Sequence, residues 1–205
     1  MAPDVTPRLV FASHNAHKRD EAWAILEPLL PGWTSEDLAS AGDFDVPAPV
    51  EDGVTFADNA LVKARAVCAA TGLPAVADDS GLAVDVMGGA PGIFSALWSG
   101  EHGADEDNLR LLLAQLEDIP DVHRGAAFVC AAALVTPAGV EVVREGRMLG
   151  RIAREAAGAG GFGYDPIFVP KGCEVTAAEL SVAQKNAISH RGKAFTAIAP
   201  DLAAL

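Results

Sequence analysis

Short apolar runs alternate along this chain with amphipathic segments, and this alternation limits the possible folds more than any other feature. Residues 8–12 and 74–77 have the composition of strands that are buried on both faces. Residues 18–30 and 55–71 instead place their apolar side chains at helical spacing, and Gly72 marks the end of the second helix. This order of strands and helices predicts an α/β fold with a central sheet.

The second half of the chain adds a helix and a pair of strands. Residues 105–116 carry leucines at helical spacing, and residues 126–135 and 140–147 are expected to pair around a Pro-Ala-Gly turn. The antiparallel pairing of these two strands would make the sheet mixed. A last helix should begin near residue 183 or 187.

The composition indicates a folded and acidic protein. Half of the 205 residues (50%) are hydrophobic, which lets the chain bury enough apolar area to offset its conformational entropy. No linker is apparent, so residues 1–7 are expected to form a tail and residues 8–205 a single domain. Acidic residues outnumber basic residues 28 to 15, which gives a formal net charge of −13. Such a surface repels polyanions, so we expect neither nucleic acid nor a membrane as a partner.

The cysteines and the N-terminal residues favour a cytoplasmic protein. Cys68, Cys130 and Cys173 are odd in number and widely spaced, so neither disulfides nor a zinc site is expected. The first seven residues lack a basic region followed by an apolar one, so they do not resemble a secretory signal. No apolar run is long enough to span a bilayer.

The first segment with chemical interest follows the strand at residues 8–12. A strand that turns directly into a helix leaves backbone N–H groups and the positive end of the helix dipole free to bind an anion. Ser13, Asn15 and Lys18 would add donors and a positive charge to such a site. An ordinary helix N-cap with a surface lysine explains the segment equally well, and the spacing is not that of a Walker A loop.

Two adjacent carboxylates, Asp78 and Asp79, come directly after the apolar run 74–77, and a separate strand could follow at residues 82–87. Carboxylates in such a position are costly unless they bind a cation or act as acid–base groups. The carboxyl edge of a sheet is also where open α/β folds bind their ligands. The alternative is an Asx turn with a solvent-facing aspartate. Glu51, ahead of the long helix, could supply a further carboxylate or be an ordinary loop charge.

A glycine-rich stretch and a cationic cluster add to the candidate site. Residues 151–168 are expected to be mostly loop, and within them Phe162 and Tyr164 offer flat faces on which a heterocycle could stack. Residues 183–193 gather cationic and polar side chains at a helix start, which suits phosphate or the keto oxygens of a base. A flexible loop and a solvated helix face are the simpler alternatives. Carboxylates for a hard metal, lysines and an aromatic loop together indicate a nucleoside triphosphate site.

Five motifs occur in order over most of the chain. They are Ser13-x-Asn15-x-x-Lys18-x-x-Glu21, Thr55-Phe56-x-x-Asn59-Ala60-x-x-Lys63-Ala64, Ala77-Asp78-Asp79-Ser80-Gly81-Leu82 with Gly88-Gly89-Ala90-Pro91-Gly92, Gly161-Phe162-Gly163-Tyr164-Asp165-Pro166, and Ser189-His190-Arg191-Gly192. Together they resemble the inosine triphosphate pyrophosphatase family, whose members are also called XTP/dITP diphosphatases. The resemblance runs from about Arg8 to Phe195.

The resemblance implies a reaction, a cofactor and a fold. The reaction is the hydrolysis of non-standard purine nucleoside triphosphates (ITP, dITP and XTP) to the monophosphate and pyrophosphate, which cleanses the nucleotide pool, with Mg²⁺ as the cofactor. The fold is α/β, an elongated mixed β-sheet flanked by helices, with two lobes around a central cleft. A homodimer is also implied.

The resemblance assigns roles to individual residues as well. Asp79 matches the catalytic carboxylate that binds metal and accepts a proton, and Glu51 matches a second metal ligand. The positions that match substrate contacts are Ser13, His14, Asn15, Ala16, His17, Lys18, Ser80, Phe162, Gly163, Tyr164, Asp165, Lys185, His190 and Arg191. His14 and His17 depart from the family, in which glycine is frequent at both positions, so a side chain at residue 14 could crowd a phosphate.

Two other functions fit parts of the same pattern. A Maf-like pyrophosphatase, which has a related fold, would cut modified pyrimidine or dTTP-type nucleotides, but the Ser-His-Arg segment and the Gly-Phe-Gly-Tyr-Asp loop argue against it. A nucleotide-binding regulator without turnover would need no base beside a metal, whereas this chain keeps Asp78 and Asp79 together with its lysines. If the chain is a purine pyrophosphatase, His190 and Arg191 are expected to donate to O6 of the base.

Overall fold

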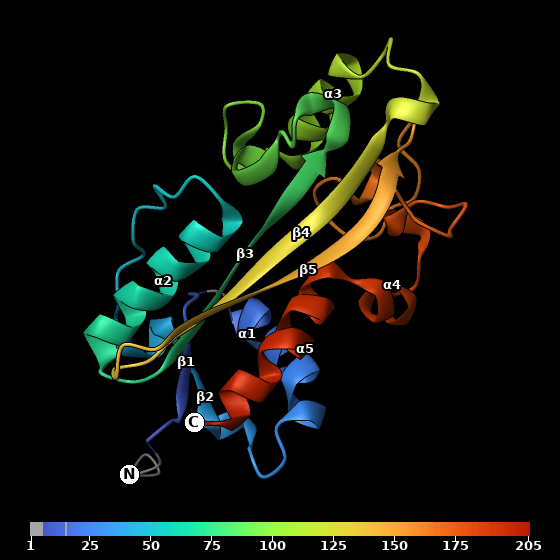
Figure 1. Ribbon diagram of the computed structural model, residues 1–205. Coiled ribbons are helices and arrows are strands. Elements are labelled where there is room, and N and C mark those ends of the chain that lie inside the picture. Colours follow the sequence, from blue (N-terminus) through green and yellow to red (C-terminus); the bar gives the residue numbers. More distant parts are fainter. Residues whose placement is uncertain (1–5, 15) are drawn as a thin grey trace. The chain divides into compact units, whose positions relative to one another are not determined.

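The computed structural model describes residues 6–14 and 16–205, which form two compact units (Figure 1). The first unit contains the described residues up to Asp79 together with Cys130–Gly146 and Arg191–Leu205. The second unit contains Ser80–Val129 and Arg147–His190. Three strands pass from one unit into the other, so each unit holds part of the same sheet.

Strands and helices alternate along the chain in the way that the sequence predicts. The strands are β1 (Leu9–Phe11), β2 (Leu38–Ser40), β3 (Ala75–Val84), β4 (Gly125–Val135), β5 (Glu141–Ile152) and β6 (Phe168–Pro170). The α-helices are α1 (Ala16–Leu26), α2 (Phe56–Thr71), α3 (Asp105–Gln115), α4 (Val182–Ile188) and α5 (His190–Ala203). The strands form one sheet in the order β2-β1-β3-β4-β5-β6. β1 is parallel to β2 and β3 whereas β6 is antiparallel to β5, which confirms a mixed sheet.

The first unit covers both faces of its part of the sheet with helices (Figure 1). Leu9 and Phe11 of β1 pack with α1 and α5, and the Phe11 ring lies 6.2 Å from that of Phe195. Val10 points the other way and packs in a second core with Ala60 of α2. Because successive side chains of a strand alternate between faces, this arrangement explains why β1 is apolar throughout.

The second unit has a core of its own on one side of α3. Leu109 and Leu112 of this helix pack with Leu82 of β3, Met148 of β5 and Phe168 of β6. The helix begins at the position that its leucine spacing predicts. Its apolar stripe is therefore what holds it to the strands of this unit.

β3 is longer than the sequence suggests, and this changes where the two aspartates lie. The expectation of two short strands with Asp78 and Asp79 between them is wrong, because both residues lie inside the single strand Ala75–Val84. Pairing with β1 ends at Val76, but β3 continues beside β4. Polar residues can remain within a strand when a neighbouring strand pairs with their backbone N–H and C=O groups and their side chains also have partners.

Two other segments differ in detail from the sequence-based expectation. The glycine-rich stretch expected over residues 151–168 is shorter, because β5 reaches Ile152 and β6 already begins at Phe168. The last helix is in fact two helices, α4 and α5, which are separated at Ser189 by an extended backbone with φ −63° and ψ 145°. In the part of the chain that the structure describes, no helix is both long and apolar enough to cross a membrane.

Candidate functional site

The two aspartates of β3 point to opposite faces of the sheet in the first unit, because side chains alternate along a strand. Asp79 lies on the side of α2, where it contacts Lys63 and Asn59. Asp78 lies on the side of α1 and α5, where it contacts Arg191. The adjacent carboxylates therefore do not form one joint cation site, and each has a basic partner of its own.

Asp79 is the centre of a group that we name the carboxylate–lysine cluster, formed by Asp79, Lys63, Asn59 and Glu51. The ammonium of Lys63 lies 2.9 Å from Oδ1 of Asp79 and 3.1 Å from Oε2 of Glu51. The amide of Asn59 donates to Oδ2 of Asp79 over 3.4 Å. The side chains of Lys63 and Asp79 are 15% and 16% exposed, so one largely buried ammonium bridges two carboxylates.

The start of α2 explains why these side chains meet. Thr55 caps the helix, since its hydroxyl accepts a hydrogen bond from a backbone N–H of the first turn. Asn59 and Lys63 are four residues apart and share the helix face that contacts β3. The backbone N–H of Gly53 donates to the side chain of Asn59 over 2.9 Å, and a Cβ at Gly53 would lie 2.5 Å from that oxygen. Glycine therefore lets the loop that carries Glu51 approach the helix.

Burial raises the pKa of Asp79 above its ordinary value. The Lys63 ammonium opposes this shift, and the negative charge of Glu51 adds to it. Burial alone would lower the pKa of Lys63, but the two carboxylates outweigh burial and raise it. Because one ammonium faces two carboxylates, the cluster keeps an excess negative charge, and a carboxylate with a raised pKa in this setting suits a proton acceptor.

The chemistry of the cluster also suits a divalent cation. Mg²⁺ takes oxygen ligands and commonly binds through one or two carboxylates together with substrate phosphates. Asp79 and Glu51 are such carboxylates, and the Lys63 ammonium already stands at a cation position that both of them reach. Within residues 6–14 and 16–205, no three or more His, Cys, Asp or Glu side chains gather in a way that could hold a metal ion. A metal held here would therefore need ligands from a substrate.

On the other face of β3, Arg191 connects α5 with α1 and with the strand. Its guanidinium lies 2.6 Å from the carboxylate of Glu21 and 3.3 Å from that of Asp78. It also donates to the carbonyl of Lys18 over 3.4 Å. The side chains of Arg191 and Asp78 are 16% and 10% exposed. The arginine that the sequence suggests as a donor to the base is thus engaged by two carboxylates in this structure.

The turn between β1 and α1 is tied to the end of β2 and to the loop that follows. The carbonyl of Ser13 accepts a hydrogen bond from the hydroxyl of Ser40 over 2.7 Å. Nε2 of His14 lies 2.6 Å from the carbonyl of Val46, which makes the ring nitrogen the donor. The imidazole at residue 14 is therefore held by the adjacent loop rather than left free to turn.

The other residues predicted for this segment lie at the start of α1 or outside the described part of the chain. Ala16 and His17 are the first two residues of α1. Lys18 follows them in the first turn, and it is exposed. Asn15 lies outside the described residues.

In the second unit, the glycine-rich loop is organised around Asp165. This carboxylate is 2% exposed and accepts hydrogen bonds from the backbone of Phe162, over 2.9 Å, and from the ammonium of Lys185. Gly161 has a φ of +74°, and a Cβ there would collide with Asp165, so this position requires glycine. The ring of Phe162 is 75% exposed, with the Lys185 ammonium 5.0 Å from its centroid. An exposed ring beside a cation suits the stacking of a heterocycle.

Tyr164 differs from the sequence-based expectation that its ring offers a stacking face. The residue is 4% exposed and belongs to the core of the second unit. Its hydroxyl donates to the carbonyl of Ser95 over 2.8 Å, and burial raises its pKa. The backbone N–H of the neighbouring Gly163 donates to Asp105 over 3.0 Å. Tyr164 thus anchors the loop to the core of the second unit, whereas Phe162 is the exposed aromatic residue of this loop.

His190 and Ser80 complete the residues that the sequence predicts. The imidazole of His190 stacks on the ring of Phe128, with centroids 5.1 Å apart and an interplanar angle of 15°. Ser80 is exposed on β3 and directly follows Asp79 in the chain. The predicted residues therefore divide into two groups. Asp79, Glu51, Arg191 and the described residues of the β1–α1 segment belong to the first unit, whereas Ser80, Phe162–Asp165, Lys185 and His190 belong to the second.

Some residues that contact the predicted site residues have no role predicted from the sequence. Asn59 and Lys63 contact Asp79, and Glu21 contacts Arg191, yet these three were only positions within motifs. A polar residue such as Asn59, four positions before a lysine on an otherwise apolar helix face, is a usable signal of a buried contact. Asp105 reaches Gly163 across 58 residues, and nothing local in the sequence indicates that contact.

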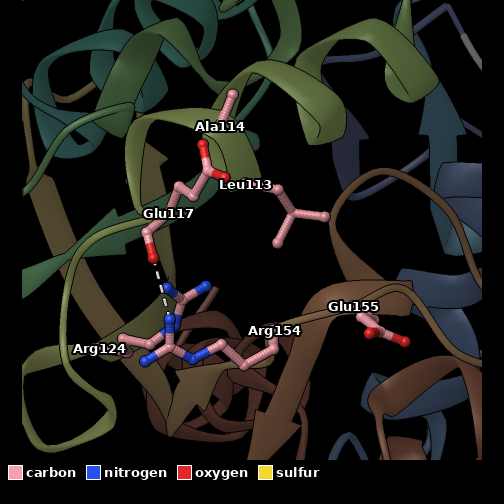
Figure 2. Close-up of a pocket in the computed structure, with 6 residues that line it drawn as sticks. All are labelled: Leu113, Ala114, Glu117, Arg124, Arg154 and Glu155. Atoms are coloured by element: carbon pink, nitrogen blue, oxygen red, sulfur yellow. Dashed lines mark hydrogen bonds between the residues drawn. The ribbon is translucent and has the colours of Figure 1, made fainter.

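A cavity of about 410 Å³ in the second unit is lined by other residues (Figure 2). The lining residues are Leu113, Ala114, Glu117, Arg124, Arg154 and Glu155. Arg154, on its lining, donates to the carbonyl of Glu117 over 2.9 Å, as the dashed line in Figure 2 shows. Since it shares no residue with either group among the described residues, this cavity is not part of the candidate site.

The chain is similar to known proteins over nearly all of its length. A model of the Ham1 family matches residues 9–201. A dITP/XTP pyrophosphatase of Streptomyces avermitilis is 57% identical over 194 residues, which cover 94% of this chain and 96% of that protein. A dITP/XTP pyrophosphatase of Streptomyces coelicolor is 58% identical over 195 residues, with the same coverage of both chains.

Solved structures agree with the sequence comparison. A nucleoside-triphosphatase / dITP/XTP pyrophosphatase from Mycobacterium abscessus is 54% identical, with a TM-score of 0.81, over 94% of this chain and 98% of that chain. A HAM1 protein from Coxiella burnetii is 38% identical, with a TM-score of 0.88, over 98% of this chain and all (100%) of that chain. The α/β fold with a mixed sheet is therefore shared with both.

Proposed function

Because the chain belongs to the Ham1 family, we propose that it is a dITP/XTP pyrophosphatase, which hydrolyses non-standard purine nucleoside triphosphates to the monophosphate and pyrophosphate. One observation in the structure supports the chemistry most directly. The ammonium of Lys63 bridges Asp79 and Glu51, which puts a carboxylate of raised pKa beside a cation position. A general base next to a metal is what hydrolysis of a phosphoanhydride requires.

Asp79 is the proton acceptor in this proposal. Its carboxylate takes a proton from water, whose oxygen forms a bond to the α-phosphorus while the bond from that phosphorus to the α–β bridging oxygen breaks. Pyrophosphate leaves with the electron pair of the broken bond. Asn59 donates to one oxygen of Asp79 from the start of α2, which orients the base. Mg²⁺, held through Asp79 and Glu51, would neutralise phosphate charge that otherwise repels the nucleophile.

We assign the phosphates to the turn between β1 and α1. This turn leads into the N-terminus of α1, where backbone N–H groups favour an anion, and Ser13 is held in place by Ser40. The exposed ammonium of Lys18 would stabilise the departing pyrophosphate. The ring of His14 is engaged by the carbonyl of Val46, so we expect this residue to contact phosphate through its backbone.

We assign the base to the loop around Asp165. The exposed ring of Phe162 would stack on the purine, and Lys185, beside that ring, would donate to a keto oxygen. We also assign His190 and Arg191 as donors to O6, on the basis of the family resemblance. A site built to donate to O6 disfavours adenine, whose 6-amino group is itself a donor.

The test is the release of pyrophosphate from a panel of nucleotides with and without Mg²⁺. We expect dITP, XTP and ITP to be hydrolysed only with the metal, and ATP, GTP and dTTP to be poor substrates. Turnover of dTTP in preference to dITP would favour a Maf-like pyrophosphatase. Tight binding of dITP without any pyrophosphate would favour a regulator. Either outcome would refute the proposal.

Three further properties belong to the same proposal. Mg²⁺ as the metal is supported by the oxygen donors of the carboxylate–lysine cluster. A homodimer and a cytoplasmic location are supported by resemblance to the family. Light scattering of the purified protein measures its oligomeric state, and a monomer at micromolar concentration would contradict the proposed homodimer.

A further inference from the structure

The Lys63 ammonium stands at the point of the carboxylate–lysine cluster from which a single cation reaches both carboxylates. It lies 2.9 Å from Asp79 and 3.1 Å from Glu51, and its side chain is 15% exposed. Burial disfavours an ammonium, so this position is maintained by the two negative charges around it. Lys63 is thus a resident counter-ion of the pair.

A divalent cation that used both carboxylates would have to lie where the ammonium lies or very close to it. Two cations a few ångströms apart repel each other strongly when water is largely excluded. The metal therefore binds weakly, or Lys63 moves. A lysine side chain has a flexible four-carbon stem, and its ammonium donates well to phosphate oxygens, so a triphosphate offers it a new partner.

We propose that Lys63 keeps the metal position closed until a nucleoside triphosphate arrives. On binding, the ammonium exchanges its two carboxylate partners for a phosphate oxygen, and Asp79 and Glu51 become available to the metal. The inference rests on the proposed function, because that function supplies the phosphate. Lys63 acts here as a positioning residue that decides when the metal can bind.

The negative charge of the nucleotide supports the exchange. With Lys63 in place, two carboxylates face one positive charge. If the metal joined without the nucleotide, it would lie close to the Lys63 ammonium, and the two cations would repel each other. The triphosphate brings several negative charges of its own, which attract both the metal and the Lys63 ammonium and so offset the repulsion between these two cations. Metal and nucleotide should therefore favour each other reciprocally.

The first experiment measures Mn²⁺ affinity by calorimetry, without nucleotide, for the wild-type protein and for Lys63→Met. We expect the variant to bind Mn²⁺ at least about tenfold more tightly, equivalent to about 1.4 kcal/mol. A variant that had lost structure would bind Mn²⁺ more weakly, which is the opposite of the expected change. Lys63→Arg keeps the charge and should bind Mn²⁺ as weakly as the wild type.

Two more variants guard against simpler explanations. Lys171→Met removes a positive charge from an exposed site in the second unit and should leave Mn²⁺ affinity unchanged. Lys63→Gln keeps a neutral donor for Asp79, and it should show the same tighter binding even if Lys63→Met folds poorly. Circular dichroism in EDTA checks that each variant is folded before metal is added.

The second experiment repeats the titration with a saturating α,β-methylene analogue of dITP. We expect the analogue to raise Mn²⁺ affinity more in the wild type than in Lys63→Gln, by at least about the same tenfold factor. Equal or weaker Mn²⁺ binding by the neutral variants would overturn the proposal, and so would equal coupling in both proteins. Neither titration involves turnover, so a failure here is distinct from a failure of the nucleotide panel.

Discussion

Asp78 and Asp79 are adjacent in sequence, but they have different neighbours and different expected roles. Their partners Arg191 and Lys63 lie 113 and 16 residues away in the chain, on opposite sides of β3. That buried carboxylates need partners could be predicted, because burying an unpaired charge is costly. Which partner each takes could not, because it follows from the alternation of a strand whose length was underestimated.

Among single residues, the replacement Asp79→Asn gives the clearest expectation for activity. Asparagine keeps the shape of the side chain but cannot accept the proton from water. We expect the rate of pyrophosphate release from dITP to fall at least about 10²-fold, with the fold intact. Asp118→Asn, at an exposed position of the second unit, is the control and should retain activity. Near-normal turnover by Asp79→Asn would remove Asp79 from the mechanism.

The same variant should change the pH dependence of stability. The pKa of Asp79 is raised in the folded protein, so the wild type loses stability as pH rises from the unfolded pKa through the folded one. Asp79→Asn has no such loss, so its stability relative to that of the wild type should increase as pH rises from acid to neutral. Calorimetry at several pH values measures this, with about 2–4 °C in Tm for each kcal/mol. A lower Tm than the wild type at neutral pH would show that Lys63 depends on the charge of Asp79.

Arg191→Ala separates a structural role from a role in base selection. The variant leaves the 10% exposed side chain of Asp78 without its cation, so we expect a loss of stability of about 1.5–3 kcal/mol. If Arg191 also donates to O6, the ratio of kcat/KM for dITP over dATP should fall as well. Arg191→Lys keeps the charge but not the forked geometry, and it should restore stability better than selectivity. An unchanged ratio in a folded Arg191→Ala protein would leave Arg191 with the structural role alone.

Elements whose ends are marked by local signals were predicted well. α2 runs from Phe56 to Thr71 as expected, because Thr55 caps one end and Gly72, with φ +68°, terminates the other. Elements whose ends depend on neighbouring strands were not. β3 continues past Val76 because β4 lies beside it, and pairing of this kind leaves no mark on the local sequence.

Arg124 is an example of how distant elements are joined, and its replacement tests that role. It is 2% exposed, and its guanidinium donates to the carbonyls of Leu116, Ile152 and Ala153 at the ends of α3 and β5. We expect Arg124→Met to lower stability by at least about 2 kcal/mol, because buried carbonyls lose their donors. Urea unfolding measures the loss. Arg124→Lys should recover little of it, since one ammonium cannot replace a planar fork.

The outcome for activity is what distinguishes this role from a catalytic one. No described residue of either predicted group contacts the Arg124 guanidinium by the hydrogen bonds above. The folded Arg124→Met protein should therefore hydrolyse dITP normally well below its Tm. A large loss of kcat in the folded variant would contradict a purely structural role.

For the molecule as a whole, the distribution of charge matters more than its sum. At least eight of the fifteen basic residues are ion-paired in the described part of the chain, namely Arg19, Lys63, Arg65, Arg110, Arg144, Arg154, Lys185 and Arg191. Composition could predict the acidic surface but not this local compensation. Composition could not predict the division into two units either, which only the family resemblance implies, because shared strands join the units where a linker would otherwise be visible in the sequence.

This compensation leads to an expectation about nucleic acid. Binding to a polynucleotide requires several unpaired lysines or arginines along successive phosphates, each of which releases counter-ions. Because the net charge is −13 and more than half of the basic residues are ion-paired in the described part of the chain, we expect no such row, whereas one dITP needs only a few local donors. A fluorescent single-stranded oligonucleotide should therefore show no change in anisotropy at about 0.15 M salt. The same oligonucleotide in excess should leave dITP hydrolysis uninhibited. Micromolar binding that weakens steeply with salt would contradict this expectation, because it would show that several surface cations bind phosphates jointly.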